Sequence, residues 1–353
     1  MAITGCKKKQ IAVLTGGGDA PGLNAVIRGI TVKAISLGYD VIGFKKGWAG
    51  LLNQGETHPL DLDQVASIHV TGGTILGTSR TNPYKEENGV NQVKESLKKH
   101  CCEAIIAIGG EDTLGVANKL NKDGIKVVGV PKTIDNDLSG TDYTFGFDTS
   151  VNIAAKAIRD LHTTAESHRR IMIVEIMGRH AGWITMHASI AGGAHITLLP
   201  EEKFDLNEIC KVIKNRQDKG KNHTIIAVSE GAVPKQGDMA LQTKEKDAFG
   251  HVRLGGIAQG LCEELEKSCG QECRHVVLGH LQRAGAPSAF DVVLGTRLGV
   301  KAMELIDKKE FGKMAALKGT EIVSVDLQEA VGTLKTVPKE FIKEEKLFWG
   351  IDD

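Results

Sequence analysis

The chain has 353 residues, with 44 basic and 44 acidic side chains that give a formal net charge of zero. Single domains usually hold about 100–200 residues, so two domains with large cores are expected. A neutral chain with only 4% aromatic residues is not typical of a nucleic-acid or anionic-membrane binder, and we expect neither partner.

Apolar, β-rich runs alternate with longer helical stretches. The predicted strands are Ile11–Thr15, Asp40–Phe44, Ala104–Ile108, Lys126–Val130, Ile171–Ile176, Thr224–Val228 and Arg274–Leu278. Helices are expected over Asn24–Ala34, over Thr113–Leu120 and after Gly182. Near-continuous Val and Ile runs are typical of strands buried on both faces, and their alternation with helices predicts an α/β fold with doubly wound, mainly parallel sheets.

In such sheets, ligands bind outside the carboxyl ends of the strands. Six predicted strands end in polar or glycine-rich turns, which begin at Gly16, Gly109, Lys132, Met177, Ser229 and Gly279. The turn after Ile11–Thr15 has neither a Walker A nor a GxGxxG pattern, so by itself it fits a tight turn as well as a phosphate site. The helix that follows favours phosphate, because its unpaired N–H groups attract anions.

Two of these turns combine carboxylates with one lysine. They contribute Glu111, Asp112, Lys132, Asp135 and Asp137. A metal-assisted phosphoryl transfer needs a carboxylate for Mg²⁺, a carboxylate base and a cation. Asp135 and Asp137 could instead cap a helix or satisfy a turn, but directly after a buried strand they suit a base and its orienting partner.

Several cationic residues lie at strand ends and loop starts. Arg80 ends the glycine-rich stretch Gly72–Arg80, and either is solvated there or reaches a phosphate with its bidentate guanidinium. The others, each of which would singly fit a surface position, together predict a sugar-phosphate clamp: Arg170, Arg179, Arg274, His280 and Arg283. Met177 beside Arg179 could be an ordinary core residue.

With these segments in view, the chain closely resembles the 6-phosphofructokinase family from Val13 to about Gly319. The resemblance rests on TGGGDAPGLNAVIRG, GGTILGTSR, GGEDT, PKTIDND, TDYTFGFDT, EIMGRHAGW and VLGHLQR. It implies two Rossmann-like α/β domains with the active site between them, and Mg²⁺-dependent transfer of a phosphoryl group to fructose 6-phosphate. It also implies a homodimer or homotetramer in which Arg170 and Arg274 reach a neighbouring subunit's active site.

The resemblance also assigns roles. Asp135 is the base for the 1-hydroxyl, Asp137 orients it, Thr133 hydrogen-bonds the transferring phosphoryl group, Arg80 neutralises charge and Glu111 is the Mg²⁺-linked carboxylate. The residues assigned to the phosphoryl donor are Gly17, Asp112, Thr113 and Lys132. The residues assigned to the sugar are Met177, Gly178, Arg179 and Glu230. Those assigned to its 6-phosphate are Arg170, Arg274, His280 and Arg283.

The phosphoryl donor depends on two positions. ATP-using members usually carry glycine where this chain has Asp112 and Lys132, and a glycine at 112 leaves room for the α-phosphate of ATP. An aspartate fills that room and adds a like charge, while Lys132 can hold a free phosphate. Both residues together resemble the pyrophosphate-dependent branch, with pyrophosphate and fructose 6-phosphate as substrates of a reversible step in glycolysis or gluconeogenesis.

Other functions remain as alternatives. An ATP-dependent or mixed-donor phosphofructokinase is the first. A NAD or lipid kinase would not need all these motifs in one chain, and a non-catalytic sugar-phosphate-binding subunit would not need Asp135, Asp137, Thr133 and Glu111 together. We expect the donor-side domain over 1–146 and about 282–330, and the sugar-side domain over 147–281 and about 331–353. Since Met1–Gln10 lacks an apolar signal region and no apolar run is long enough for a membrane span, we expect a cytoplasmic protein.

Overall fold

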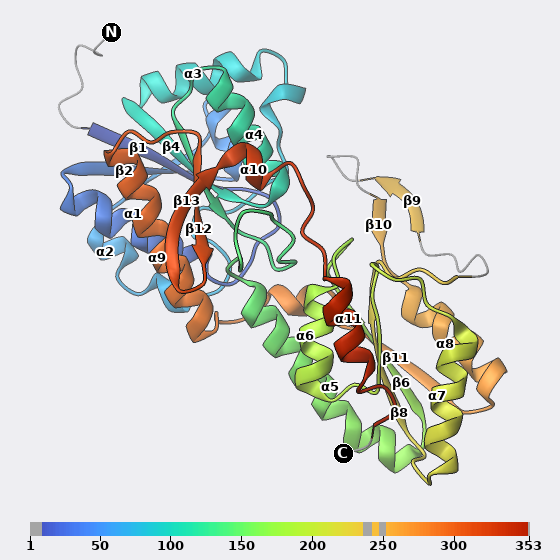
Figure 1. The fold of residues 1–353 in the computed structure, drawn as a ribbon. Helices are drawn as coiled ribbons and strands as arrows, with labels where there is room; N and C mark the ends of the chain where they lie inside the picture. Colours follow the sequence, from blue (N-terminus) through green and yellow to red (C-terminus); the bar gives the residue numbers. More distant parts are fainter. Residues whose placement is uncertain (1–8, 236–241, 247–251, 352–353) are drawn as a thin grey trace. The chain divides into compact units, whose positions relative to one another are not determined.

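The structure is a computed structural model that describes residues 9–235, 242–246 and 252–351. The chain divides into two compact units, coloured along the sequence in Figure 1. The first unit contains residues 1–134, 138–148 and 283–334, and the second contains residues 135–137, 149–282 and 335–353. No helix in the described part of the chain is both long enough and apolar enough to cross a membrane.

The first unit is built on a seven-stranded sheet in the order β13-β12-β5-β4-β1-β2-β3. The strands β12, β5, β4, β1 and β2 pair in parallel, and the two edge strands β3 and β13 pair antiparallel. The strands are β1 (Lys9–Thr15), β2 (Tyr39–Phe44), β3 (Thr57–Leu60), β4 (Cys102–Gly109), β5 (Val127–Pro131), β12 (Lys313–Lys318) and β13 (Glu321–Asp326).

Helices cover both faces of this sheet. The longer ones are α1 (Leu23–Ser36), α3 (Gly89–Lys99), α4 (Glu111–Lys122) and α9 (Ala289–Asp307), and the short ones are α2 (Leu62–Val65) and α10 (Leu327–Ala330). Alternate residues of β1 enter different cores. Ile11 and Val13 pack with α1 and α9, whereas Ala12 and Leu14 pack with α3 and α4. A strand whose two faces both enter a core must be apolar throughout, which explains the continuous apolar runs in the sequence.

The second unit has a parallel four-stranded sheet in the order β11-β6-β8-β7. Its strands are β6 (Ile171–Ile176), β7 (Ile196–Leu198), β8 (Thr224–Ser229) and β11 (Cys273–Val277), and a separate hairpin joins β9 (Gln242–Lys246) to β10 (Val252–Leu254). Its helices are α6 (Trp183–Gly192), α7 (Leu206–Asp218), α8 (Ile257–Cys269) and α11 (Lys339–Lys346). The helix α5 (Phe147–His168) begins in the first unit and continues in the second.

The α/β class and the parallel pairing predicted from the sequence are confirmed. The predicted burial of the last strand is wrong, because β11 is an edge strand and only Cys273 within it is buried. The antiparallel edges β3 and β13 were not predicted. Their sequences, such as Thr57-His-Pro-Leu60, carry mixed polar residues, since one side of an edge strand has no neighbouring strand.

Candidate active site

The glycine turn after β1 is packed closely within the first unit. A Cβ atom on Gly16 would stand 2.6 Å from Oγ1 of Thr113, so no larger residue fits there. The N–H of Gly17 donates to the carbonyl of Ser79 at 3.0 Å, and the carbonyl of Gly17 accepts from Oγ1 of Thr78 at 2.5 Å. The turn is therefore fixed from two sides while its backbone carries no side chain that would keep a phosphate away.

The loop 72–80 places Arg80 next to this turn. Oγ1 of Thr15 donates to the carbonyl of Gly77 at 2.8 Å, and Oγ of Ser79 donates to the carbonyl of Lys46 at 2.6 Å. Arg80 is the exposed residue directly after this anchored stretch. A guanidinium in that position can form bidentate hydrogen bonds with a phosphate bound at the turn.

Lys132 brings a buried cation to the same turn. It follows β5, only 5% of its surface is exposed, and its backbone N–H donates to the carbonyl of Gly109 at 2.9 Å. Its Nζ donates to the carbonyl of Gly18, and a Cβ on Gly17 would stand 3.5 Å from that Nζ. This buried ammonium adds a positive charge beside the turn, which favours an anion there.

Arg283 is a second cation at the turn. A Cβ on Gly18 would stand 2.7 Å from Nη1 of Arg283, so the guanidinium lies directly against Gly18. The sequence grouped Arg283 with His280 as contacts of the 6-phosphate. In the structure Arg283 belongs to the first unit, whereas His280 is an exposed residue of the second.

The carboxylates of Glu111 and Asp112 form the first turn of α4. The helix begins at Glu111, two residues earlier than predicted, after Gly110 as its N-cap. Acidic side chains are favoured there because the N-terminus of a helix carries partial positive charge. Thr113, 3% exposed, packs under Gly16 and Gly109. The helix terminus that would otherwise attract a phosphate therefore already holds a carboxylate at Asp112.

The segment that carries the predicted base belongs to the second unit. Asp135 and Asn136 are 8% and 2% exposed, and Asn136 has a left-handed backbone with φ of 52°. The carbonyl of Asp137 accepts from the N–H of Lys335 at 2.9 Å. Thr133, two positions before Asp135, belongs to the first unit, and its carbonyl accepts from Oγ1 of Thr144 at 2.7 Å.

The turn after β6 is held by two side chains. Oε1 of Glu230, at the end of β8, accepts from the N–H groups of Gly178 at 3.3 Å and Arg179 at 3.0 Å. Oε1 of Gln282 accepts from the N–H of Met177 at 2.9 Å. Gly178 has a φ of 148°, and a Cβ there would stand 2.6 Å from the carbonyl oxygen of Ala181. Three of the four residues predicted to contact the sugar thus share one turn, and the fourth, Glu230, holds that turn in place.

Gln282 was not given a role from the sequence, although the motif VLGHLQR contains it. It is fully buried, and its Nε2 donates to Oγ of Ser150 at 3.3 Å. A buried amide needs partners for both its donor and its acceptor. The oxygen of Gln282 accepts from the Met177 turn, and its nitrogen donates to Ser150 in α5. A glutamine next to Arg283 has no sequence signal that would separate it from a surface residue.

Burial raises the pKa of Glu230 to about 7, and the negative charge of Asp135 contributes to the increase. The hydrogen bonds from Arg179 and Gly178 act in the opposite direction, because they stabilise the carboxylate. The effect of Asp135 on Glu230 shows that the predicted base and the predicted sugar contact lie near each other in the second unit. A buried carboxyl group with a raised pKa, such as that of Glu230, is common at catalytic sites.

This shift predicts a pH-dependent stability that Glu230→Gln should remove. Because the folded-state pKa is raised from 4.5, the unfolding free energy contributed by the acid form is complete below about pH 4.5 and is lost as the pH rises through about 7. Urea unfolding should therefore show Glu230→Gln about 3 kcal/mol more stable than wild type at pH 8.5, with little difference at pH 5. Glu344→Gln, an exposed glutamate of α11, is the control. An equal difference at both pH values would contradict the assignment.

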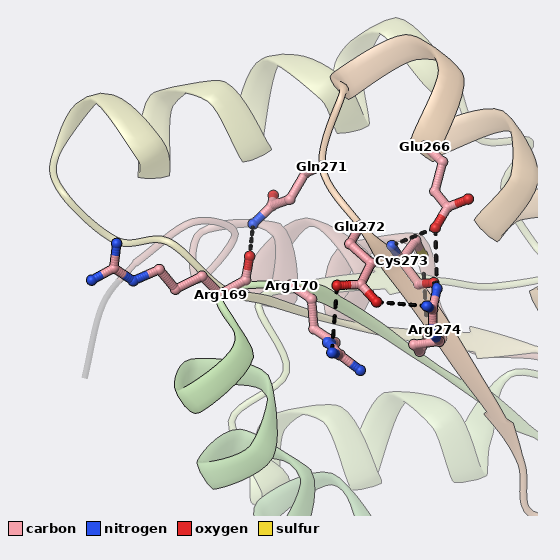
Figure 2. A network of polar contacts seen from close by, with 7 residues as sticks. All are labelled: Arg169, Arg170, Glu266, Gln271, Glu272, Cys273 and Arg274. Atoms are coloured by element: carbon pink, nitrogen blue, oxygen red, sulfur yellow. Dashed lines mark hydrogen bonds and ion pairs between the residues drawn. The ribbon is translucent and has the colours of Figure 1, made fainter.

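Arg170 and Arg274, predicted to bind the 6-phosphate, lie together at the start of β6 and β11 (Figure 2). Glu272 joins them, with Oε2 at 3.4 Å from Nη2 of Arg170 and Oε1 at 2.5 Å from Nη2 of Arg274. Oε1 of Glu266 is 3.3 Å from Nη1 of Arg274. The two guanidinium groups thus converge on the carboxylate of Glu272. Two guanidinium groups placed this closely can also bind a phosphate.

A second polar cluster in this unit lies outside the candidate site. His162, His195 and His223 offer ring nitrogens within 4.8 Å of one another. Nδ1 of His195 accepts from the N–H of Ile225 at 2.8 Å, so the proton of the neutral ring is on Nε2. Neither nitrogen of His195 then has a free lone pair for a metal. The cluster is better described as three packed rings than as a metal centre.

These rings predict acid sensitivity. Burial lowers the pKa of His195 from 6.5 to about 2, and burial also lowers the pKa of His223, with Arg216 contributing to both. A depressed pKa gives stability that is complete above about pH 6.5 and is lost as the pH falls toward 2. The unfolding free energy should fall by about 1.4 kcal/mol per pH unit through His195 alone. His195→Gln should flatten this slope and His168→Gln, exposed on α5, should not.

Comparisons with known proteins identify the family of the chain. The family model described as Phosphofructokinase matches residues 10–306. The pyrophosphate–fructose 6-phosphate 1-phosphotransferase of Amycolatopsis methanolica is 56% identical over 97% of this chain and 100% of its own length. An ATP-dependent 6-phosphofructokinase of Corynebacterium efficiens is 52% identical over 94% of this chain and 96% of its own.

A solved structure shows the same fold at lower identity. The pyrophosphate-dependent phosphofructokinase of Nitrosospira multiformis superposes with a TM-score of 0.83 at 22% identity, over 96% of this chain and 88% of that one. The family match covers most of the chain, and the two curated relatives match it almost from end to end. The chain belongs to the phosphofructokinase family of phosphotransferases.

Proposed function

We propose that the protein transfers a phosphoryl group from pyrophosphate to the 1-hydroxyl of D-fructose 6-phosphate, giving D-fructose 1,6-bisphosphate and phosphate. The observation that carries the choice of donor is the pair Asp112 and Lys132. Relatives named for either donor are more than 50% identical, so overall identity does not separate pyrophosphate from ATP. The ATP-dependent or mixed-donor enzyme is therefore the second candidate.

The local geometry supports pyrophosphate. Asp112 occupies the first turn of α4, where the α-phosphate of ATP would meet a carboxylate instead of free N–H groups. Lys132 places its ammonium at the carbonyl of Gly18, and Arg283 lies against the same glycine. Two cations at one glycine turn suit a small, highly charged donor that has no adenosine for further contacts.

In this proposal Asp135 accepts the proton of the 1-hydroxyl as its oxygen attacks the phosphorus, and the bond to the leaving phosphate breaks. Glu230, Met177, Gly178 and Arg179 orient the sugar. His280 and Arg283 bind its 6-phosphate together with Arg170 and Arg274 of a neighbouring subunit, because in their own chain these two arginines lie at the opposite end of β6 from Met177. Lys132 and Arg80 offset the negative charge of the transferring and leaving groups. Thr133 hydrogen-bonds the transferring group.

Mg²⁺ fits the residues present at the start of α4. Glu111 is an exposed carboxylate, and hard oxygen ligands of this kind suit Mg²⁺, which keeps several of its waters. When bound, the ion would neutralise charge on the donor's phosphates. The proposal also includes a cytoplasmic location. It further includes assembly into a homodimer or homotetramer, because the Arg274 side chain on the edge strand β11 is 53% exposed and can therefore contact another subunit.

The reverse reaction tests the proposed donor. Fructose 1,6-bisphosphate with inorganic phosphate and Mg²⁺ should yield pyrophosphate, detectable by ³¹P NMR, because pyrophosphate and a phosphate ester differ little in transfer potential. An enzyme that uses ATP would form no pyrophosphate from these reactants. Formation of ATP from ADP in a parallel reaction, without pyrophosphate in the first, would favour the second candidate.

A further inference from the structure

The turn that carries the predicted base has an unusual backbone. Asn136 adopts a left-handed conformation with φ of 52° although it is not glycine, and it is 2% exposed. A non-glycine residue in this region costs free energy and persists only where surrounding contacts fix it. The contacts that fix Asn136 therefore also determine where Asp135 and Asp137 stand.

Lys335 contacts this turn twice. Its backbone N–H donates to the carbonyl of Asp137 at 2.9 Å, and its Nζ donates to Oδ1 of Asn136 at 3.1 Å. Its own carbonyl accepts from Nε1 of Trp183 at 2.9 Å, and its Nζ lies 5.5 Å from the centroid of the Trp183 ring. One residue far along the chain thus connects the turn to the first residue of α6.

Glu201 fixes the other side of this connection. Its Oε1 accepts from the N–H of Val337 at 2.9 Å and from the N–H of Gly182, the residue before Trp183, at 2.8 Å. The segment 335–337 and the start of α6 are therefore held together at two points. We call Lys335, Trp183 and Glu201 the Lys335 brace. All of it lies in the second unit, together with Asp135.

We propose that Lys335 is a positioning residue for Asp135, acting through Asn136 and Asp137. This inference rests on the proposed function, since it assumes that Asp135 is the base. Lys335 holds the backbone of Asp137 with its N–H and the side chain of Asn136 with its ammonium, so both residues that follow Asp135 are fixed by contacts with Lys335. Misplacement of a catalytic group by about 1 Å can cost about 100-fold in rate.

Lys335→Met tests this inference, because methionine keeps the backbone hydrogen bond and much of the stem but removes the ammonium. We expect kcat to fall by about 10- to 100-fold while KM for fructose 6-phosphate changes by less than about threefold. Lys335→Arg, which retains a cation for Asn136 and for the Trp183 ring, should recover most of the loss. Lys339→Met, an exposed lysine at the start of α11, is the matched control and should equal wild type.

A second measurement is independent of turnover. Hydrogen exchange of a peptide that spans Asp135–Asp137 should be faster in Lys335→Met than in wild type and in Lys339→Met. Unchanged kcat and unchanged exchange would overturn the inference, as would equal losses in Lys335→Met and Lys339→Met. If the wild type itself shows no turnover with fructose 6-phosphate, the proposed function fails. The exchange measurement then still decides whether Lys335 fixes the turn.

Discussion

Replacing Asp135 with asparagine is expected to lower kcat by about 10²- to 10⁴-fold and to leave fructose 6-phosphate binding within about threefold. Asparagine has nearly the same shape but cannot accept the proton of the 1-hydroxyl. Asp135 is 8% exposed, and its charge helps to raise the pKa of Glu230, so the two carboxylates act in one environment. Loss in kcat without loss in binding identifies a group needed mainly in the transition state.

The experiment compares steady-state kcat with the Kd of fructose 6-phosphate from calorimetry. Asp218→Asn, an exposed aspartate at the end of α7, is the matched control and should keep wild-type kcat. Near-normal kcat in Asp135→Asn would assign the base to another residue. Loss of sugar binding to the same extent as kcat would instead make Asp135 a binding residue.

Replacing both Asp112 and Lys132 with glycine is expected to raise the ratio of kcat/KM for ATP to kcat/KM for pyrophosphate by about 10²- to 10³-fold. Each factor of ten corresponds to about 1.4 kcal/mol. The first substitution removes a carboxylate from the start of α4, where it would repel a nucleotide phosphate. The second removes the ammonium at Gly18 that favours the small donor.

The two single variants make this a double-mutant cycle, which shows whether the positions act together. Asp123→Gly, at the other end of α4, is the control for loss of an aspartate and should leave the ratio unchanged. If ATP turnover stays undetectable in the double variant, residues other than Asp112 and Lys132 select the donor. Pyrophosphate turnover should fall, because Lys132 is buried at the donor turn.

Sequence patterns were sufficient to predict the parallel strands that are buried on both faces. The run Ile171–Ile176 coincides with β6, because a strand between two helical layers contains only apolar side chains apart from special positions such as Glu175. That glutamate is buried because its oxygens accept from the N–H groups of Gly256 and Ala258 at the start of α8. Edge strands such as β11 could not be identified as exposed, since position in a sheet is a property of topology.

The candidate site was predicted where a motif follows a strand, and missed where the contact is remote in sequence. Gly17, Lys132 and Glu230 follow strands, so their proximity to a ligand could be expected from the fold. Lys335 lies 199 positions from Asn136, and nothing in the surrounding polar sequence distinguishes it from other lysines. Gln282 was visible as part of a motif, but its role in holding Met177 depends on burial that no local pattern reveals.

The most direct test of the central proposal is the initial rate with fructose 6-phosphate and Mg²⁺, measured with pyrophosphate and with ATP as donors in parallel. We expect turnover with pyrophosphate and a much lower rate, or none, with ATP. This result would support both the reaction and the role of Asp112 and Lys132. Faster turnover with ATP would contradict the proposed donor, and no turnover with either would contradict the proposed reaction.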